Sequence, residues 1–152
     1  MTHFPTLLRT SLFAAAMALA GCSSTPMAPM AMSSNSAAFG ATLSGAAEVP
    51  ANATSGTGSL DASLNKDTKV LRWKVTYSGL TGPATMAHFH GPAMPGANAT
   101  VVVPFPSAAS PAEGSATLTP DQISDLMAGK WYVNVHTAAN PGGEIRGQVL
   151  AR

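Results

Sequence analysis

Cysteine, charge and long apolar runs are all scarce in this chain of 152 residues. Its one cysteine, Cys22, has no partner for an internal disulfide, which excludes a disulfide-stabilised scaffold. Charged residues make up 10% of the sequence and the formal net charge is +1, so we expect no nucleic-acid partner. The apolar run at residues 11–20 is too short to cross a bilayer as a helix.

The start of the chain has the features of an export signal. One fixed positive charge, Arg9, precedes the apolar run, which ends in Leu-Ala-Gly-Cys at residues 19–22. This ending resembles a bacterial lipobox, so we predict a lipoprotein signal peptide over residues 1–21 and lipid attachment at Cys22. Ser23 gives no inner-membrane retention signal of the aspartate type. We therefore expect a lipid-anchored protein of the bacterial cell envelope, at the outer membrane and facing the periplasm.

Residues 22–38 are predicted to form a disordered tether. The segment is rich in Met, Ala, Pro and Ser and has no charge or aromatic residue, so it cannot bury enough surface to offset its ordering entropy. Met27, Met30 and Met32 carry thioethers, which are soft ligands that favour Cu(I). Such tethers also arise without a function, so the role of the methionines stays open.

A single β-rich domain is predicted from residue 39 to residue 152. Short apolar segments alternate with clusters of Gly, Pro, Asn and Ser about every ten residues, which is typical of an antiparallel sandwich or barrel. In one segment Leu71, Trp73 and Val75 alternate with polar residues, which predicts a strand with one face toward the core and one face toward solvent. We predict strands at residues 39–45, 57–64, 70–78, 85–90, 100–105, 114–118, 131–137 and 144–150.

One turn and one helix complete the predicted domain. Residues 65–68, Asn-Lys-Asp-Thr, are typical of a hairpin turn. Thr119 can cap a helix that has Pro120 in its first turn and Gln122 at the position of a capping box. Gly129 is predicted to end this helix.

Three histidines remain once the predicted signal peptide is removed, and all lie in predicted strands. His88 and His90 belong to the segment 85–91, and His136 to the segment 131–137. Residues i and i+2 of a strand point to the same face, so His88 and His90 point together. Imidazole is a common ligand of zinc and copper, so these three histidines are candidate metal ligands.

The alternation in both strands directs the imidazoles away from the hydrophobic core. In the segment 131–137 the apolar residues alternate with Tyr132, Asn134 and His136, which are predicted to face outward. Asn134 shares the face of His136 and could orient an imidazole by a hydrogen bond without binding the metal itself. Two interpretations stay open: the histidines bind a metal, or they hydrogen-bond to the neighbouring loops at residues 91–99 and 138–143.

A metal site requires the three imidazoles to converge. A shared ion about 2 Å from each nitrogen demands nitrogens within roughly 3–4 Å of one another. Copper outcompetes zinc at nitrogen sites, so we favour copper, with zinc as the less favoured metal. Met86 on the histidine face and Met94 in the following loop could supply an axial sulfur.

The acidic residues offer a less persuasive site. Glu48 and Glu144 could act as an acid and a base, but strand-end acids are more often solvated or ion-paired. Glu144 shares a face with Arg146, and we expect these two to form a structural pair. No Gly-x-Ser-x-Gly elbow or phosphate-binding loop is present.

Four longer motifs are spread over the predicted domain: Leu-Ser-Gly-Ala-Ala-Glu-Val-Pro at residues 43–50, Ala-His-Phe-His-Gly-Pro-Ala at 87–93, Gly-Lys-Trp-Tyr-Val-Asn-Val-His-Thr at 129–137 and Asn-Pro-Gly-Gly-Glu-Ile-Arg-Gly-Gln at 140–148. Together they resemble the CHRD domain, which is repeated in chordin and occurs singly in exported microbial proteins. The resemblance covers about residues 39–150. It implies an immunoglobulin-like antiparallel β-sandwich and no settled activity.

A weaker similarity is to copper–zinc superoxide dismutase, another Greek-key sandwich. His88, His90 and His136 match three copper ligands of that family in order, and Arg146 matches its anion-guiding arginine. The chain departs from the family because no further histidine is left to bridge copper to zinc and the zinc loop is absent. Superoxide dismutation is therefore the least favoured of three functions.

Two other functions are favoured over superoxide dismutation. The first is copper binding or buffering in the cell envelope, with a metal donor or acceptor protein as a partner. The alternative is a protein-interaction module anchored at the membrane surface, in which the histidines only tie loops together.

Overall fold

A computed structural model describes Met1 and residues 35–152 of the chain. Apart from Met1, the predicted signal peptide lies outside the described residues, as do Cys22 and most of the predicted tether, with Met27, Met30 and Met32. Among the residues that are described, no helix has the length and apolar character needed to span a membrane.

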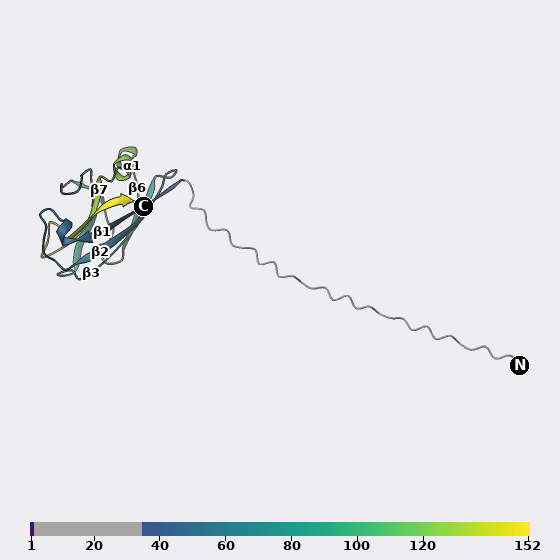
Figure 1. Cartoon of the computed structure of the whole chain (residues 1–152), viewed down its shortest axis with the longest axis horizontal. Coiled ribbons are helices and arrows are strands. Elements are labelled where there is room, and N and C mark those ends of the chain that lie inside the picture. The colour runs from purple at the N-terminus through teal and green to yellow at the C-terminus, as the bar shows by residue number, and fades with distance from the viewer. Residues whose placement is uncertain (2–34) are drawn as a thin grey trace. The chain divides into compact units, whose positions relative to one another are not determined.

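Eight antiparallel strands make up most of the described domain (Figure 1). A 3₁₀ turn, η1 (Gly45–Ala47), follows the first strand, and a single α-helix, α1 (Pro120–Met127), precedes the seventh. The strands are β1 (Ser36–Ser44), β2 (Thr57–Asn65), β3 (Val70–Ser78), β4 (Ala84–His90), β5 (Val101–Pro104), β6 (Ala112–Thr117), β7 (Trp131–Thr137) and β8 (Ile145–Ala151).

The strands form one sheet in the order β5-β4-β7-β8-β1-β2-β3-β6. The connections skip neighbours in Greek-key fashion, since β8 lies beside β1 and β6 lies beside β3. The two ends of the sheet fold over one another, because Trp73 of β3 packs edge-on against Phe89 of β4 with ring centroids 5.3 Å apart. The predicted all-β, Greek-key sandwich with one short helix is confirmed.

Local sequence signals account for most element ends. The bounds of β3 and β7 agree with the prediction, and α1 begins with the predicted capping box of Thr119 and Gln122. Gly129 ends the helix with a φ of 68°, a left-handed conformation that glycine adopts readily. Asn65 Oδ1 accepts hydrogen bonds from the amides of Asp67 and Thr68, which closes the predicted turn between β2 and β3.

The first strand begins earlier than predicted. It starts at Ser36, three residues before the predicted domain boundary, because its backbone pairs with β2 from Ser36 opposite Asn65 onward. These first residues are small and uncharged, so they carry no alternating pattern that would reveal a strand.

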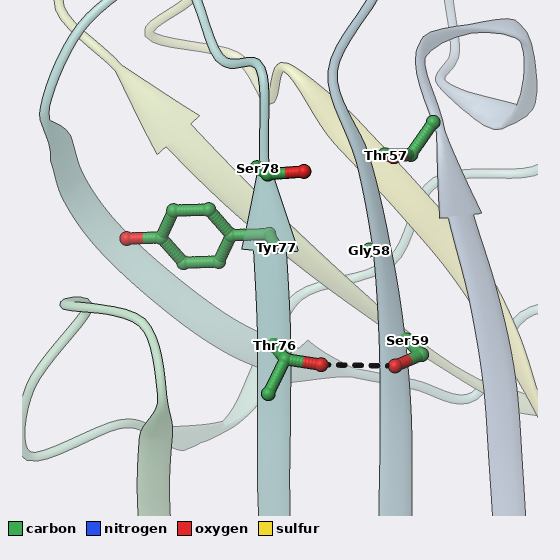
Figure 2. A pocket seen from close by; sticks show the side chains of 6 residues that line it. All are labelled: Thr57, Gly58, Ser59, Thr76, Tyr77 and Ser78. Carbon is green, nitrogen blue, oxygen red and sulfur yellow. Dashed lines mark hydrogen bonds between the residues drawn. The ribbon is translucent and has the colours of Figure 1, made fainter.

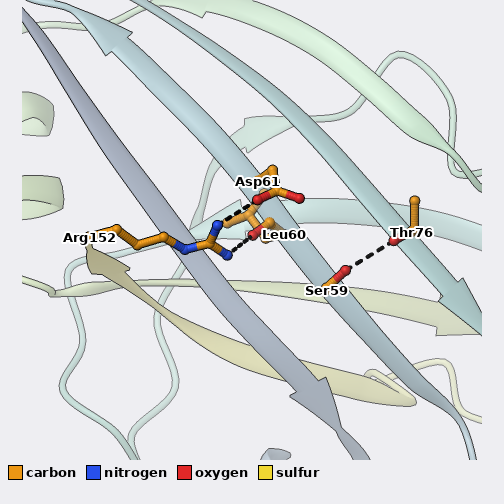
Figure 3. Close-up of polar contacts among 5 residues, drawn as sticks. All are labelled: Ser59, Leu60, Asp61, Thr76 and Arg152. Carbon is orange, nitrogen blue, oxygen red and sulfur yellow. Dashed lines mark hydrogen bonds and ion pairs between the residues drawn. The ribbon is translucent and has the colours of Figure 1, made fainter. Parts of the chain in front are cut away.

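Polar contacts on β2 and β3 lie far along the sheet from the histidines. A shallow pocket crosses these strands, with the hydroxyls of Ser59 and Thr76 3.0 Å apart at its edge (Figure 2). Nearby, Arg152 reaches across β1 over Gly40 and pairs with Asp61 at 2.6 Å (Figure 3). Both partners are more than half exposed, so this pair contributes roughly 0–1 kcal/mol.

Candidate metal centre

The three predicted ligands converge on one side of the sheet. β4 and β7 are neighbours, and their register sets His88 opposite Asn134 and Met86 opposite His136. Nδ1 of His88 lies 3.3 Å from Nε2 of His136, although the residues are 48 positions apart. One nitrogen from each of His88, His90 and His136 lies within 4.8 Å of the others. The three histidines gather as predicted, and the spacing between His88 and His136 meets the expected 3–4 Å, whereas the set as a whole, at up to 4.8 Å, does not.

Two backbone carbonyls hold the imidazoles by their far nitrogens. Nδ1 of His90 lies 3.0 Å from the carbonyl oxygen of Ala99, and Nδ1 of His136 lies 3.0 Å from that of Pro141. A carbonyl only accepts hydrogen bonds, so each Nδ1 carries the proton and donates it. Each Nε2 then offers a lone pair toward the cluster, as metal-binding histidines commonly do.

Nε2 of His90 has no hydrogen-bond partner and is buried. A buried nitrogen without a partner costs about 1–3 kcal/mol of desolvation energy. Most buried polar groups in folded proteins are paired, so an unpaired one calls for a specific reason. A bound cation at this nitrogen would remove the penalty.

The face that carries the histidines is covered, which corrects one expectation. Asn134, His136 and Tyr132 do point away from the hydrophobic core, but they are only 3–6% exposed. The loops that supply the carbonyls of Ala99 and Pro141 close over this face. Alternation predicts which side of a strand a residue takes, but not whether loops cover that side.

Burial also sets the protonation of the rings. Burial, followed by the charges of His136 and His90, lowers the pKa of His88. Burial is likewise the largest cause that lowers the pKa of His90. Lower pKa values keep the rings neutral at neutral pH, and the neutral form is the one that binds metal.

Tyr132 and Arg146 support His90 from the side. Tyr132 lies between them in the sheet. Its ring stacks on His90 with the ring centroids 4.7 Å apart, and the guanidinium carbon of Arg146 lies 3.4 Å from the centroid of the tyrosine ring. Arg146 also donates to Asn98 Oδ1 at 3.0 Å and to the carbonyl of Ala97 at 2.6 Å. Arg146 is 2% exposed, so it fixes the loop over His90 from within the fold.

The sequence did not identify Glu48 as a neighbour of this cluster. Its carboxyl is 6% exposed and lies against the Asn134 amide and the Cα of Gly143. Burial raises the pKa of Glu48, while Arg146, the Val49 amide and the Asn134 side chain oppose that rise. The one available signal was an acid in a charge-poor segment, which does not show what the acid contacts.

Glu144 occupies a different environment from Glu48. Its two oxygens accept hydrogen bonds from the hydroxyls of Thr54, Thr81 and Thr137 at 2.6–2.7 Å, and from the Thr81 amide at 2.7 Å. The expected pair between Glu144 and Arg146 is wrong, because threonines surround the acid and loop 91–99 takes the guanidinium. Glu144 therefore acts as a structural tie between three segments of chain.

The two sulfur candidates lie nearer the solvent. Met86 is 47% exposed and Met94 is 61% exposed. An axial thioether from either residue stays a prediction.

All of these residues belong to one recognised domain. A family model described as CHRD domain matches residues 39–149. The chain belongs to the CHRD family. The CHRD domain contains the three histidines, Asn134 and Glu48, and its boundaries agree closely with those of the β-sandwich. Comparisons with curated proteins and with solved structures gave no match.

Proposed function

We propose that this CHRD domain binds one copper ion through His88 Nδ1, His90 Nε2 and His136 Nε2, and that it buffers copper in the cell envelope. Two observations carry the proposal: one nitrogen from each of the three histidines lies within 4.8 Å of the others, and Nε2 of His90 is buried without a partner. Copper is favoured over zinc because it binds nitrogen sites more tightly at equal availability. A protein that donates copper to the site or accepts it would be the natural partner.

The alternative, an interaction module with histidines that only tie loops, explains fewer contacts. It accounts for the Nδ1 bonds of His90 and His136 to Ala99 and Pro141. It leaves His90 Nε2 buried without a partner, although a hydrogen bond between the two imidazoles explains the 3.3 Å between His88 Nδ1 and His136 Nε2 as well as a metal does. Metal bonds of about 2 Å put neighbouring ligand atoms close to that distance.

Dismutase-like catalysis has the least support. An arginine that guides anions needs contact with solvent, whereas Arg146 is 2% exposed and committed to Asn98 and Ala97.

Metal loading tests the proposal. We would use the full chain with Cys22→Ser, so that no thiol competes for copper, and count bound metal by mass spectrometry after dialysis against copper or zinc. The expected result is one copper per chain, retained in preference to zinc. A chain that keeps neither metal contradicts the proposal and leaves the interaction module.

We further propose that lipid on Cys22 anchors the domain at the outer membrane, facing the periplasm. The support is the lipobox-like Leu-Ala-Gly-Cys at residues 19–22. Labelled palmitate should enter the wild-type chain in cells and be absent from Cys22→Ser. Equal labelling of both chains rules out the anchor.

A further inference from the structure

A fourth donor atom faces the three imidazoles. Asn134 is 3% exposed and lies on β7, opposite His88 of β4. Its Oδ1 lies 3.0 Å from His136 Nε2. The amide oxygen therefore adjoins one of the three proposed ligands, His136.

Glu48 explains why the oxygen of the amide, and not its nitrogen, faces the rings. The Glu48 carboxylate and Asn134 Nδ2 both lie against Gly143, where an added Cβ would come within 2.8 Å of Nδ2. A carboxylate only accepts hydrogen bonds, so the amide end beside it has to be the NH₂ group. Oδ1 is thereby directed toward His136.

This arrangement brings two hydrogen-bond acceptors together. Since His136 Nδ1 donates to the Pro141 carbonyl, its Nε2 carries a lone pair directed at the lone pairs of Asn134 Oδ1. Such groups repel unless a cation lies between them. With metal bonds of about 2 Å, the 3.0 Å separation corresponds to an angle of roughly 97° at the ion, near the right angle of tetragonal N,O sites, and the 3.3 Å between His88 and His136 corresponds to roughly 111°.

We infer that Asn134 is a fourth ligand, and that the set of three nitrogens and one oxygen selects Cu(II) over Cu(I). The inference rests on the proposed function and names the form of copper that the site takes. Tetragonal N,O coordination is characteristic of Cu(II), whereas Cu(I) prefers soft sulfur. Both nearby thioethers, Met86 and Met94, are largely exposed.

A different role for Asn134 gives a different result. If a proton on His136 Nε2 donates to Asn134, the asparagine only orients the ring, and its loss weakens both oxidation states alike. If Asn134 is a ligand, its loss weakens Cu(II) selectively. The ratio of the two affinities therefore separates a ligand from a positioning residue.

The experiment compares Asn134→Leu, Asn134→Ser and Asn134→Asp in the full chain with Cys22→Ser. Cu(II) affinity is measured with cupric sulfate against an aminocarboxylate chelator. Cu(I) affinity is measured anaerobically with ascorbate and a colorimetric chelator. Met27, Met30 and Met32 are replaced by leucine in every chain, including the reference, so that Cu(I) cannot bind these thioethers instead of the histidine site.

We expect Asn134→Leu and Asn134→Ser to bind Cu(II) about 100-fold more weakly and to change Cu(I) affinity less than about threefold. A selective loss of this size raises the copper potential by about 120 mV, at 59 mV per tenfold change. Asn134→Asp keeps the oxygen, so it should bind Cu(II) to within about tenfold of wild type. The serine variant carries the test if the leucine variant does not fold.

Equal weakening of both oxidation states, or no change in either, overturns the fourth-ligand inference and leaves the three-histidine site intact. Failure of the proposed function gives a different result, because the wild-type chain then retains neither Cu(I) nor Cu(II).

Glu48→Gln tests whether Glu48 orients the Asn134 amide, since a glutamine side chain can both accept and donate hydrogen bonds and so lets this amide turn. The preference of the Glu48→Gln chain for Cu(II) over Cu(I) should fall about tenfold. An unchanged preference would show that Glu48 does not orient the Asn134 amide.

Discussion

Replacing His88 or His136 with alanine should lower copper affinity more than 100-fold. This loss is larger than the one typically caused by replacing a residue that hydrogen-bonds to a metal ligand. Each of these histidines contributes one of three converging nitrogens, so its loss leaves the ion with only two imidazoles and the proposed Asn134 oxygen. Metal counting after dialysis measures the loss.

The two variants differ in their effect on the fold. His136 is 6% exposed and donates to the Pro141 carbonyl, so its removal empties a buried position, loses this hydrogen bond and lowers stability. His88 is only partly buried, so His88→Ala should lose copper with little loss of stability. The matched control is Ser59→Ala on the distant face of β2, which should keep both copper and stability. Copper retained by His88→Ala at wild-type affinity would be incompatible with the proposed site.

Replacing Glu144 with glutamine should destabilise the domain by about 3 kcal/mol at pH 7. Burial raises the pKa of Glu144, but hydrogen bonds from Thr137, Thr81 and Thr54 and from the Thr81 amide outweigh burial and bring it from 4.5 to about 2. A difference of this size between the unfolded and folded pKa corresponds to about 3 kcal/mol of folding free energy. Urea unfolding at pH 7 measures the difference.

The same acid predicts a pH dependence. The folded pKa lies below the unfolded value, so the stabilisation is complete above pH 4.5 and declines as pH falls toward about 2. Wild type should lose stability over this interval, and Glu144→Gln should lose about 3 kcal/mol less over the same interval. Glu113→Gln serves as the control, because its ion pair with Lys74 is exposed and contributes roughly 0–1 kcal/mol. Parallel pH profiles for wild type and Glu144→Gln would show that the threonines do not stabilise the charge.

Local patterns in the sequence predicted the faces of the strands. Side chains alternate along a strand, so Val133 and Val135 indicate the core side of β7 and assign His136 to the opposite side. The capping box at Thr119 and the glycine at position 129 likewise act over only a few residues. The CHRD-like motifs added the family, which the match over residues 39–149 confirms.

Contacts between distant segments could not be derived from such patterns. The convergence of His88 with His136 depends on the register between β4 and β7, which no local signal specifies. The proximity of Glu48 to Asn134 depends on how the loop after β1 folds over the sheet. The error over Glu144 has the same origin: it shares a strand face with Arg146, but threonines from three segments satisfy its carboxylate first.

Anomalous X-ray scattering at the copper edge, from crystals of the copper-loaded chain, tests the metal site most directly. The account predicts a single strong peak about 2 Å from His88 Nδ1, His90 Nε2 and His136 Nε2. A copper peak elsewhere in the domain, with His90 and His136 still bonded to the Ala99 and Pro141 carbonyls and no density between the three rings, would contradict it.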